Sequence, residues 1–361
     1  MRNRWEYKKF ETCINKVPKA KQVKTNDYNT GTKYPIVSQE DKLISGYYDD
    51  ESMVYHIDSP VIIFGDHTRV LKYVDFDFVV GADGVKVISP KNELNAKFLL
   101  YYLTWYKIPN LGYSRHYKLL KDLDIPIPPK STQLTIVSEL DKINELIRLK
   151  KEQLVEYDNL AQSIFYEMFG DPVENEKGWE VKKLGDICVF SQGIQIDVSK
   201  QKNDFQEGYN RFLRIVDYTT FNTDIRYVPV TDKKYWINLD DIVVVRYGAS
   251  AGFVGIMKEG ILANNLFKIS YPRDRLEMLY LFHYLQSGYY KSFIQKIAFG
   301  AAMPALSFSS FGKLEVMIPP LPLQQSFASR IEQIEKLKSE VQNAITDLET
   351  LLASRMQYWF E

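Results

Sequence analysis

The chain contains the stretch Leu123-Asp124-Ile125-Pro126-Ile127-Pro128-Pro129, and 191 residues later it contains Leu314-Glu315-Val316-Met317-Ile318-Pro319-Pro320. The same offset holds without a gap to the end of the chain, where it pairs Gln133 with Gln324, Leu146 with Leu337, and Leu160 with Leu351. Self-similarity at a fixed offset is typical of a protein built from repeated structural units. The sequence therefore predicts two copies of one unit.

A second match opens each half, where Trp5–Phe10 parallels Trp179–Leu184. Between the two anchors the similarity is weak, but the order of features persists: Lys33–Val37 resembles Arg211–Val216, Pro60–Gly65 resembles Asp241–Arg246, and Leu94–Leu103 resembles Leu276–Leu285. The ends of the unit match while its middle diverges. Each unit is therefore predicted to be a mixed α/β domain followed by a long helix.

The apolar residues after each Pro-Pro pair recur at alternating spacings of three and four, which is typical of a coiled-coil seam. Because proline cannot continue a helix backwards, the Pro-Pro pairs are expected to set the helix starts. Each helix is predicted to run for about 30 residues, or roughly 45 Å. We expect the two helices to pair antiparallel; the alternative is that each packs only on its own domain. The predicted seam consists of Leu140, Ile143, Ile147, Leu154, Tyr157 and Ile164 in the first copy, and Ile331, Ile334, Val341, Ile345, Leu348 and Leu352 in the second.

The charge is balanced overall, with 46 Lys and Arg against 46 Asp and Glu among 361 residues, but it is unevenly distributed. Residues 1–33 hold nine basic and three acidic side chains, so a basic surface is compatible with zero net charge. Only two cysteines are present, Cys13 and Cys188, and no apolar run is long enough to span a bilayer. These features predict a cytoplasmic protein without a membrane segment.

The sequence contains no recognisable catalytic motif. His56, His67, His116 and His283 lack metal-ligand spacing, and there is no phosphate-binding G-x-x-x-x-G-K-[ST] loop. The glycines of 248–252 predict a tight turn between strands. Asp75, Asp77 and Asp83 lack the lysine that a nuclease centre would require nearby. The sequence therefore predicts a chain without a catalytic site, a metal site or a bound cofactor.

Three stretches carry a resemblance to a known family: Ile318–Gln325, Trp179–Ile187, and Gly300–Leu306 followed by Ser309-Ser310-Phe311. Together with the repeat, they resemble the specificity subunits of Type I restriction–modification enzymes. The first copy departs from this pattern, because Leu111–His116 replaces the Ala-Met-Pro-Ala form and the segment near Phe10 lacks Leu-Gly-Asp.

The resemblance implies an α+β chain with two similar target-recognition domains joined by two long helices that pair as an antiparallel coiled coil, in a pseudo-twofold repeat. The expected boundaries are 1–125 and 171–316 for the domains, and 126–170 and 317–361 for the helices. Each domain would read one half of a bipartite site in double-stranded DNA. The resemblance further implies two methyltransferase subunits with S-adenosylmethionine, and restriction/translocase subunits with ATP and Mg²⁺; none of these cofactors would bind to this chain.

The candidate base readers are polar and aromatic residues near strand ends, in segments that differ between the copies. Arg, Lys, Asn, Gln and Ser are the side chains that reach base edges and phosphates. Each charged residue has the alternative of a solvated surface role, and each tyrosine that of packing. For the whole chain, the alternatives are a protein-binding scaffold and a self-contained DNA-modifying enzyme fragment. The candidates are Lys33, Tyr34, Ser38, Gln39, His67, Arg69, Lys72, Tyr113, Ser114, Arg115 and His116 in the first domain, and Arg211, Arg214, Tyr218, Arg246, Tyr247, Ser250, Asn264 and Asn265 in the second.

Overall fold

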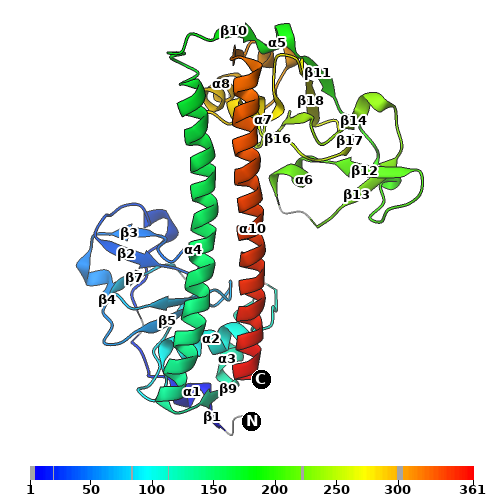
Figure 1. Ribbon diagram of the computed structural model, residues 1–361. Helices are drawn as coiled ribbons and strands as arrows, with labels where there is room; N and C mark the ends of the chain where they lie inside the picture. Colours follow the sequence, from blue (N-terminus) through cyan, green and yellow to red (C-terminus); the bar gives the residue numbers. More distant parts are fainter. Residues whose placement is uncertain (1–4, 19, 83, 113, 221–222, 299–303) are drawn as a thin grey trace. The chain divides into compact units, whose positions relative to one another are not determined.

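The computed structural model describes residues 5–361 except 19, 83, 113, 221–222 and 299–303 (Figure 1). The chain forms two compact units: unit 1 combines Met1–Lys151 with Asn343–Glu361, and unit 2 is Glu152–Gln342. Each unit therefore contains one sheet-bearing domain and about half of each long helix. The boundaries expected at 125, 170 and 316 remain predictions.

Unit 1 contains two small sheets and a two-stranded ribbon. The strand orders are β3-β2-β7-β4, β6-β5-β8 and β1-β9. Strands β2 and β7 run parallel, and the other pairs are antiparallel. The strands are β1 (Glu6–Lys9), β2 (Tyr34–Val37), β3 (Gly46–Tyr48), β4 (Val54–Tyr55), β5 (Val61–Gly65), β6 (Leu71–Val74), β7 (Phe78–Val80), β8 (Val85–Ile88) and β9 (Asp124–Ile127), and the short helices are α1 (Phe10–Cys13), α2 (Ala96–Tyr106) and α3 (Tyr117–Lys121).

Unit 2 repeats this topology. Its strand orders are β13-β12-β17-β14, β11-β18-β15-β16 and β10-β19, with β12 and β17 parallel. Strand β11 is an addition, and at this place the described part of the first copy has only the isolated bridge Ile14–Pro90. The strands are β10 (Glu180–Lys183), β11 (Val189–Gln192), β12 (Tyr209–Leu213), β13 (Arg226–Pro229), β14 (Trp236–Ile237), β15 (Ile242–Val245), β16 (Val254–Gly255), β17 (Gly260–Leu262), β18 (Leu266–Ser270) and β19 (Glu315–Ile318), and the helices are α5 (Leu184–Ile187), α6 (Ile215–Thr219), α7 (Met278–Tyr284), α8 (Gly288–Ala298) and α9 (Phe308–Phe311).

The two sequence anchors of each copy are hydrogen-bonded to each other. The opening motif forms β1 and β10, and the proline-rich stretch forms β9 and β19, its antiparallel partners. Pro126 lies within β9, which is tolerated because β9 has a partner on only one side. The anchors match between the copies because together they close each domain and lead the chain into its long helix.

The long helices are α4 (Lys130–Phe169) and α10 (Leu321–Phe360), each of 40 residues and therefore about 60 Å long. The predicted length of about 30 residues was wrong, because it counted only the seam. The first turns of each helix instead bury Ile136 and Val137, or Phe327 and Ala328, in the core of the preceding domain. Both helices begin directly after the Pro-Pro pair, as predicted.

Interhelical contacts confirm the antiparallel pairing within each unit. In unit 1, Glu139 forms an ion pair with Arg355 and accepts a hydrogen bond from Trp359 Nε1 at 3.0 Å, while Lys151 Nζ lies 2.9 Å from Glu349. In unit 2, Lys338 Nζ lies 2.8 Å from Asp158. Every predicted seam residue is buried or half-buried: Leu140, Ile143, Ile147, Ile345, Leu348 and Leu352 in unit 1, and Leu154, Tyr157, Ile164, Ile331, Ile334 and Val341 in unit 2.

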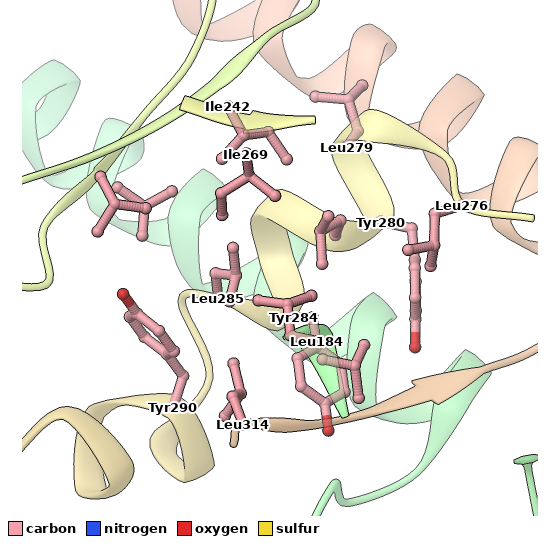
Figure 2. Close-up of a cluster of buried hydrophobic side chains, with 14 of the residues drawn as sticks. Leu184, Ile242, Ile269, Leu276, Leu279, Tyr280, Tyr284, Leu285, Tyr290 and Leu314 are labelled. Atoms are coloured by element: carbon pink, nitrogen blue, oxygen red, sulfur yellow. The ribbon is translucent and has the colours of Figure 1, made fainter. Parts of the chain in front are cut away.

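Each domain core includes side chains from both long helices. In unit 1, Phe98 of α2 packs against Phe360 of α10, with ring centroids 5.6 Å apart, and Leu140 of α4 joins the same cluster. Figure 2 shows part of the unit 2 core, to which the sheet contributes Ile242 and Ile269 and α7 contributes Tyr280 and Tyr284. Phe165 and Phe169 of α4 and Phe327 of α10 complete that core; it is thus not built on a single long helix. Among the described residues, no helix has an apolar stretch long enough to cross a membrane.

Candidate nucleic-acid interface

Arg246 is the centre of a polar cluster in unit 2. It directly follows β15, and its guanidinium carbon lies 5.0 Å from the ring centre of Tyr247 and 4.9 Å from that of Phe308. Its Nε donates to the Leu306 carbonyl at 3.1 Å, and its Nη1 donates to Gln192 Oε1. The guanidinium is therefore held in a fixed orientation while retaining further N–H donors.

Two asparagines after β17 join this cluster. Asn264 Nδ2 donates to Gln195 Oε1 at 3.2 Å, and the Asn264 carbonyl accepts from Gln192 Nε2 at 2.8 Å. The carbonyl of the exposed Asn265 accepts the Arg246 N–H at 2.8 Å. The structure thus brings Arg246, Tyr247, Asn264 and Asn265 together. The guanidinium of the arginine and the amides of the asparagines are groups suited to base edges or phosphates.

Two further polar residues of this cluster, Gln192 and Gln195, were not among the residues predicted from the sequence. They flank Gly193 at the exit of β11, where a Cβ on the glycine would lie 2.2 Å from the Ala263 carbonyl oxygen. This close approach brings the two glutamines to the β17–β18 connection. The pattern Gln-Gly-x-Gln is visible in the sequence, but its neighbour becomes known only from the β11–β18 pairing.

Ser250 lies in the turn between β15 and β16, in which Gly248 and Gly252 adopt φ of 84° and 88°. These values favour glycine because a Cβ is strained there. Ser250 lines a pocket of about 430 Å³, whose other polar lining includes Gln286, Lys291 and Gln295. It faces α8 and is not among the hydrogen-bonded members of the Arg246 cluster.

Arg211, Arg214 and Tyr218 form a separate group. Arg214 Nε lies 3.2 Å from Asp217 and its Nη1 lies 3.2 Å from Asp224, while Arg211 Nη2 lies 3.9 Å from Asp217. The Tyr218 hydroxyl is buried without a hydrogen-bond partner among the described residues, and burial raises the pKa of Tyr218. The two arginines therefore balance acidic neighbours within their own domain.

In unit 1, Ser38 and Lys72 are both buried. The Lys72 ammonium donates to the Ser38 carbonyl at 2.9 Å and to the Lys42 carbonyl, and burial lowers the pKa of Lys72. The Ser38 hydroxyl lies 2.6 Å from that of Ser45. In this conformation both side chains hold the β2–β3 loop and are not available to a DNA groove.

Gln39 and His67 lie together where β2 and β5 end. Gln39 Oε1 accepts the His67 N–H at 3.4 Å, and the Gln39 carbonyl accepts the Thr68 hydroxyl at 2.7 Å. Lys33 and Tyr34 are at the opposite end of β2, where the Lys33 N–H donates to Asp49. The strand thus separates these two candidates from Gln39.

The remaining candidates of the first domain belong to the loop between α2 and α3 and to the turn after β5. Arg115 is exposed, Ser114 is half-buried, and Tyr113 lies outside the described residues. Arg69 Nη1 donates to the Ile108 carbonyl at 3.2 Å, and His116 is fully buried. These two side chains contact the loop itself.

The polar clusters of the two units occupy equivalent places in the repeat. Both lie beyond the buried central strand, β5 or β15, and beside the segment that precedes α3 or α9. In each unit that segment is hydrogen-bonded to the residue after the strand: the His116 N–H donates to the Asp66 carbonyl, and the Leu306 N–H donates to the Arg246 carbonyl. Among the described residues, no group of three His, Cys, Asp or Glu side chains could hold a metal ion.

Comparison with known protein families identifies the repeated unit. The model of the type I restriction modification DNA specificity domain matches twice, at residues 4–156 and 176–349. The chain therefore belongs to the family of type I restriction–modification DNA specificity domains.

Individual relatives agree with this assignment. The chain is 26% identical over 196 residues to the type I restriction enzyme MjaVIII specificity subunit of Methanocaldococcus jannaschii, covering 54% of this chain and 44% of that protein. It is 28% identical over 198 residues to the EcoR124I/EcoR124II specificity subunit of Escherichia coli, covering 51% and 48%. The chain thus matches about half the length of each relative. The crystal structure of the S subunit of the type I restriction–modification system from M. genitalium has the same fold, with a TM-score of 0.61 at 14% identity, over 100% of this chain and 98% of that one.

Proposed function

We propose that the chain is the DNA-recognition subunit of a restriction–modification enzyme and that it reads a bipartite target in double-stranded DNA. The observation that carries this proposal is the double match of the specificity-domain model to two domains that share one strand order apart from the added β11. A single reader would require only one domain. Two readers in one chain are suited to a target made of two half-sites.

The two clusters present different chemistry on the same frame. The second domain presents a guanidinium and amides, from Arg246, Asn264 and Gln195. The first presents Gln39, His67 and the exposed Arg115. Because base edges are distinguished by the pattern of donors and acceptors, these sets would read different half-sites.

The proposed partners supply all catalysis. Two methyltransferase subunits with S-adenosylmethionine would assemble around α4 and α10, and restriction/translocase subunits would bring ATP and Mg²⁺. The proposed location of this assembly is the cytoplasm, where its DNA substrate is found. The names of both relatives, specificity subunits of type I restriction enzymes, support this division of labour.

The test is an electrophoretic shift assay with the complex of this chain and its methyltransferase subunits, on duplexes with and without the methylated site of the host. We expect preferential binding of the site-bearing duplex, with an affinity that falls steeply as salt rises because phosphate contacts release counterions. Binding without sequence preference or salt dependence would favour a protein scaffold. Methylation or cleavage by the isolated chain would favour a self-contained enzyme.

A further inference from the structure

The loop between α2 and α3 of the first domain carries the candidate readers Ser114 and Arg115. Its sequence differs from the corresponding segment of the second copy, and its tip is open to solvent, with Leu111 48% exposed. An exposed loop can present a defined surface to DNA bases only if its backbone is fixed. Two side chains connect this loop to the turn that follows β5.

The first connection is made by Arg69. Its φ is 62°, a left-handed conformation that is uncommon for residues other than glycine. Its Nη1 donates to the Ile108 carbonyl at 3.2 Å, at the start of the loop. Arg69 was a predicted base reader, but in the structure its side chain holds the loop.

The second connection is made by His116. Its ring Nδ1 lies 2.9 Å from the Asp66 carbonyl oxygen, and its Nε2 lies 3.1 Å from the Leu111 nitrogen. A carbonyl can only accept and a backbone N–H can only donate, so Nδ1 carries the proton and Nε2 is the acceptor. This arrangement requires a neutral imidazole. The ring is fully buried, which keeps water from replacing the Leu111 contact.

We propose that His116 is a positioning residue for base reading by the first domain, acting through the hydrogen bond from the Leu111 N–H. This inference rests on the proposed DNA-recognition function. The bond holds Leu111 on one side of the candidate readers, and His116 itself directly follows Arg115 on the other side. Holding these two positions before DNA arrives lowers the entropy lost on binding. At the same hydrogen-bonding position the second copy has the apolar Leu306, so the connection belongs to the first half-site.

The experiment uses the complex with methyltransferase subunits and three duplexes: the cognate site, and the site altered in either half. The H116L variant removes the acceptor and keeps an apolar side chain, whereas H116Q keeps a carbonyl acceptor. The control is H56L, at a histidine of the same domain whose side chain is 70% exposed. Affinity ratios between the cognate and altered duplexes are measured for every variant under the same conditions.

For H116L, we expect a loss of roughly tenfold in discrimination at one half-site only. H116Q should retain part of the discrimination, and H56L should behave as the wild type. Unchanged discrimination in H116L overturns the proposal, and equal loss at both half-sites indicates general damage and also overturns it. If H116L does not fold, H116Q alone tests the proposal. A folded H116Q that loses discrimination by the full tenfold expected for H116L then contradicts the proposal, because its carbonyl should replace the lost acceptor. A wild-type complex that recognises no bipartite site would refute the proposed function itself.

Discussion

Gln133 and Gln324 show at the scale of single residues why the repeated stretch keeps a glutamine after its prolines. Both side chains are fully buried. Each amide nitrogen donates to the carbonyl of the first proline of its pair, at 2.8 and 2.7 Å. Each also donates to a carbonyl before α2 or α7, and each amide oxygen accepts the N–H of the N-cap residue of that helix, Asn95 or Glu277. One side chain thus binds three backbone groups in each copy and joins the proline pair to the segment before α2 or α7.

Replacing Gln324 by leucine should destabilise unit 2 by at least about 2 kcal/mol, because it leaves several partly buried backbone groups without partners. The adjacent Gln325 is exposed and provides a matched control. Urea unfolding of Q324L and Q325L measures the difference. Equal stability of the two variants would show that the buried amide does not connect these segments.

At the scale of elements, His283 couples α7 to the N-terminal half of α10. Its ring lies edge-on to Phe327, with centroids 5.3 Å apart, and burial lowers its pKa to about 4. The nearby Lys338 lowers this pKa further, and Asp158 raises it. The folded state therefore favours the neutral imidazole.

The stability of unit 2 should fall as the pH decreases from about 6.5 to about 4, because over that range the unfolded chain binds a proton that the folded chain does not. The shift from 6.5 to about 4 corresponds to a loss of at most about 3 kcal/mol, which is complete below the folded pKa. The H283F variant should lose this part of the acid dependence in unfolding experiments. An unchanged pH slope in H283F, or a slope abolished by H56F instead, would assign the effect elsewhere.

The elements differ in how far the sequence predicted them. The pairing of α4 and α10 was predictable because burying an apolar seam leaves a strict periodicity, as at Leu140, Ile143 and Ile147. The ion pairs Glu139–Arg355 and Lys338–Asp158 were not, because they depend on axial register and are not related by the repeat.

The candidate interface was predictable only in part. Arg246 and Asn264 were found because polar residues after a buried strand and in a turn are conspicuous. Gln192 and Gln195 were missed because their approach to Asn264 follows from the pairing of distant strands. The candidates Ser38 and Lys72 are buried in the structure, and the sequence does not reveal that a lysine is buried on backbone carbonyls.

At the scale of the whole molecule, one chain carries two copies of one unit. The parts that match between the copies and the parts that differ have separate roles. The parts that match between the two copies close each domain and pair the helices, as the β1–β9 and β10–β19 ribbons and the two buried glutamines show. The parts that differ between the copies carry the polar clusters. This separation predicts that a domain can change its recognised bases without changing the helices.

The most direct measurement is methylome sequencing of cells that contain the methyltransferase subunits. The cells carry the wild-type chain, no chain, or a chimera whose residues 180–318 come from a family member that recognises a different target. The wild-type chain should produce methylation at two short sequences separated by unspecified bases. The chimera should change one of those sequences and preserve the other. A single contiguous motif, or a methylation pattern identical in the chimera and the wild type, would contradict two independent readers in one chain.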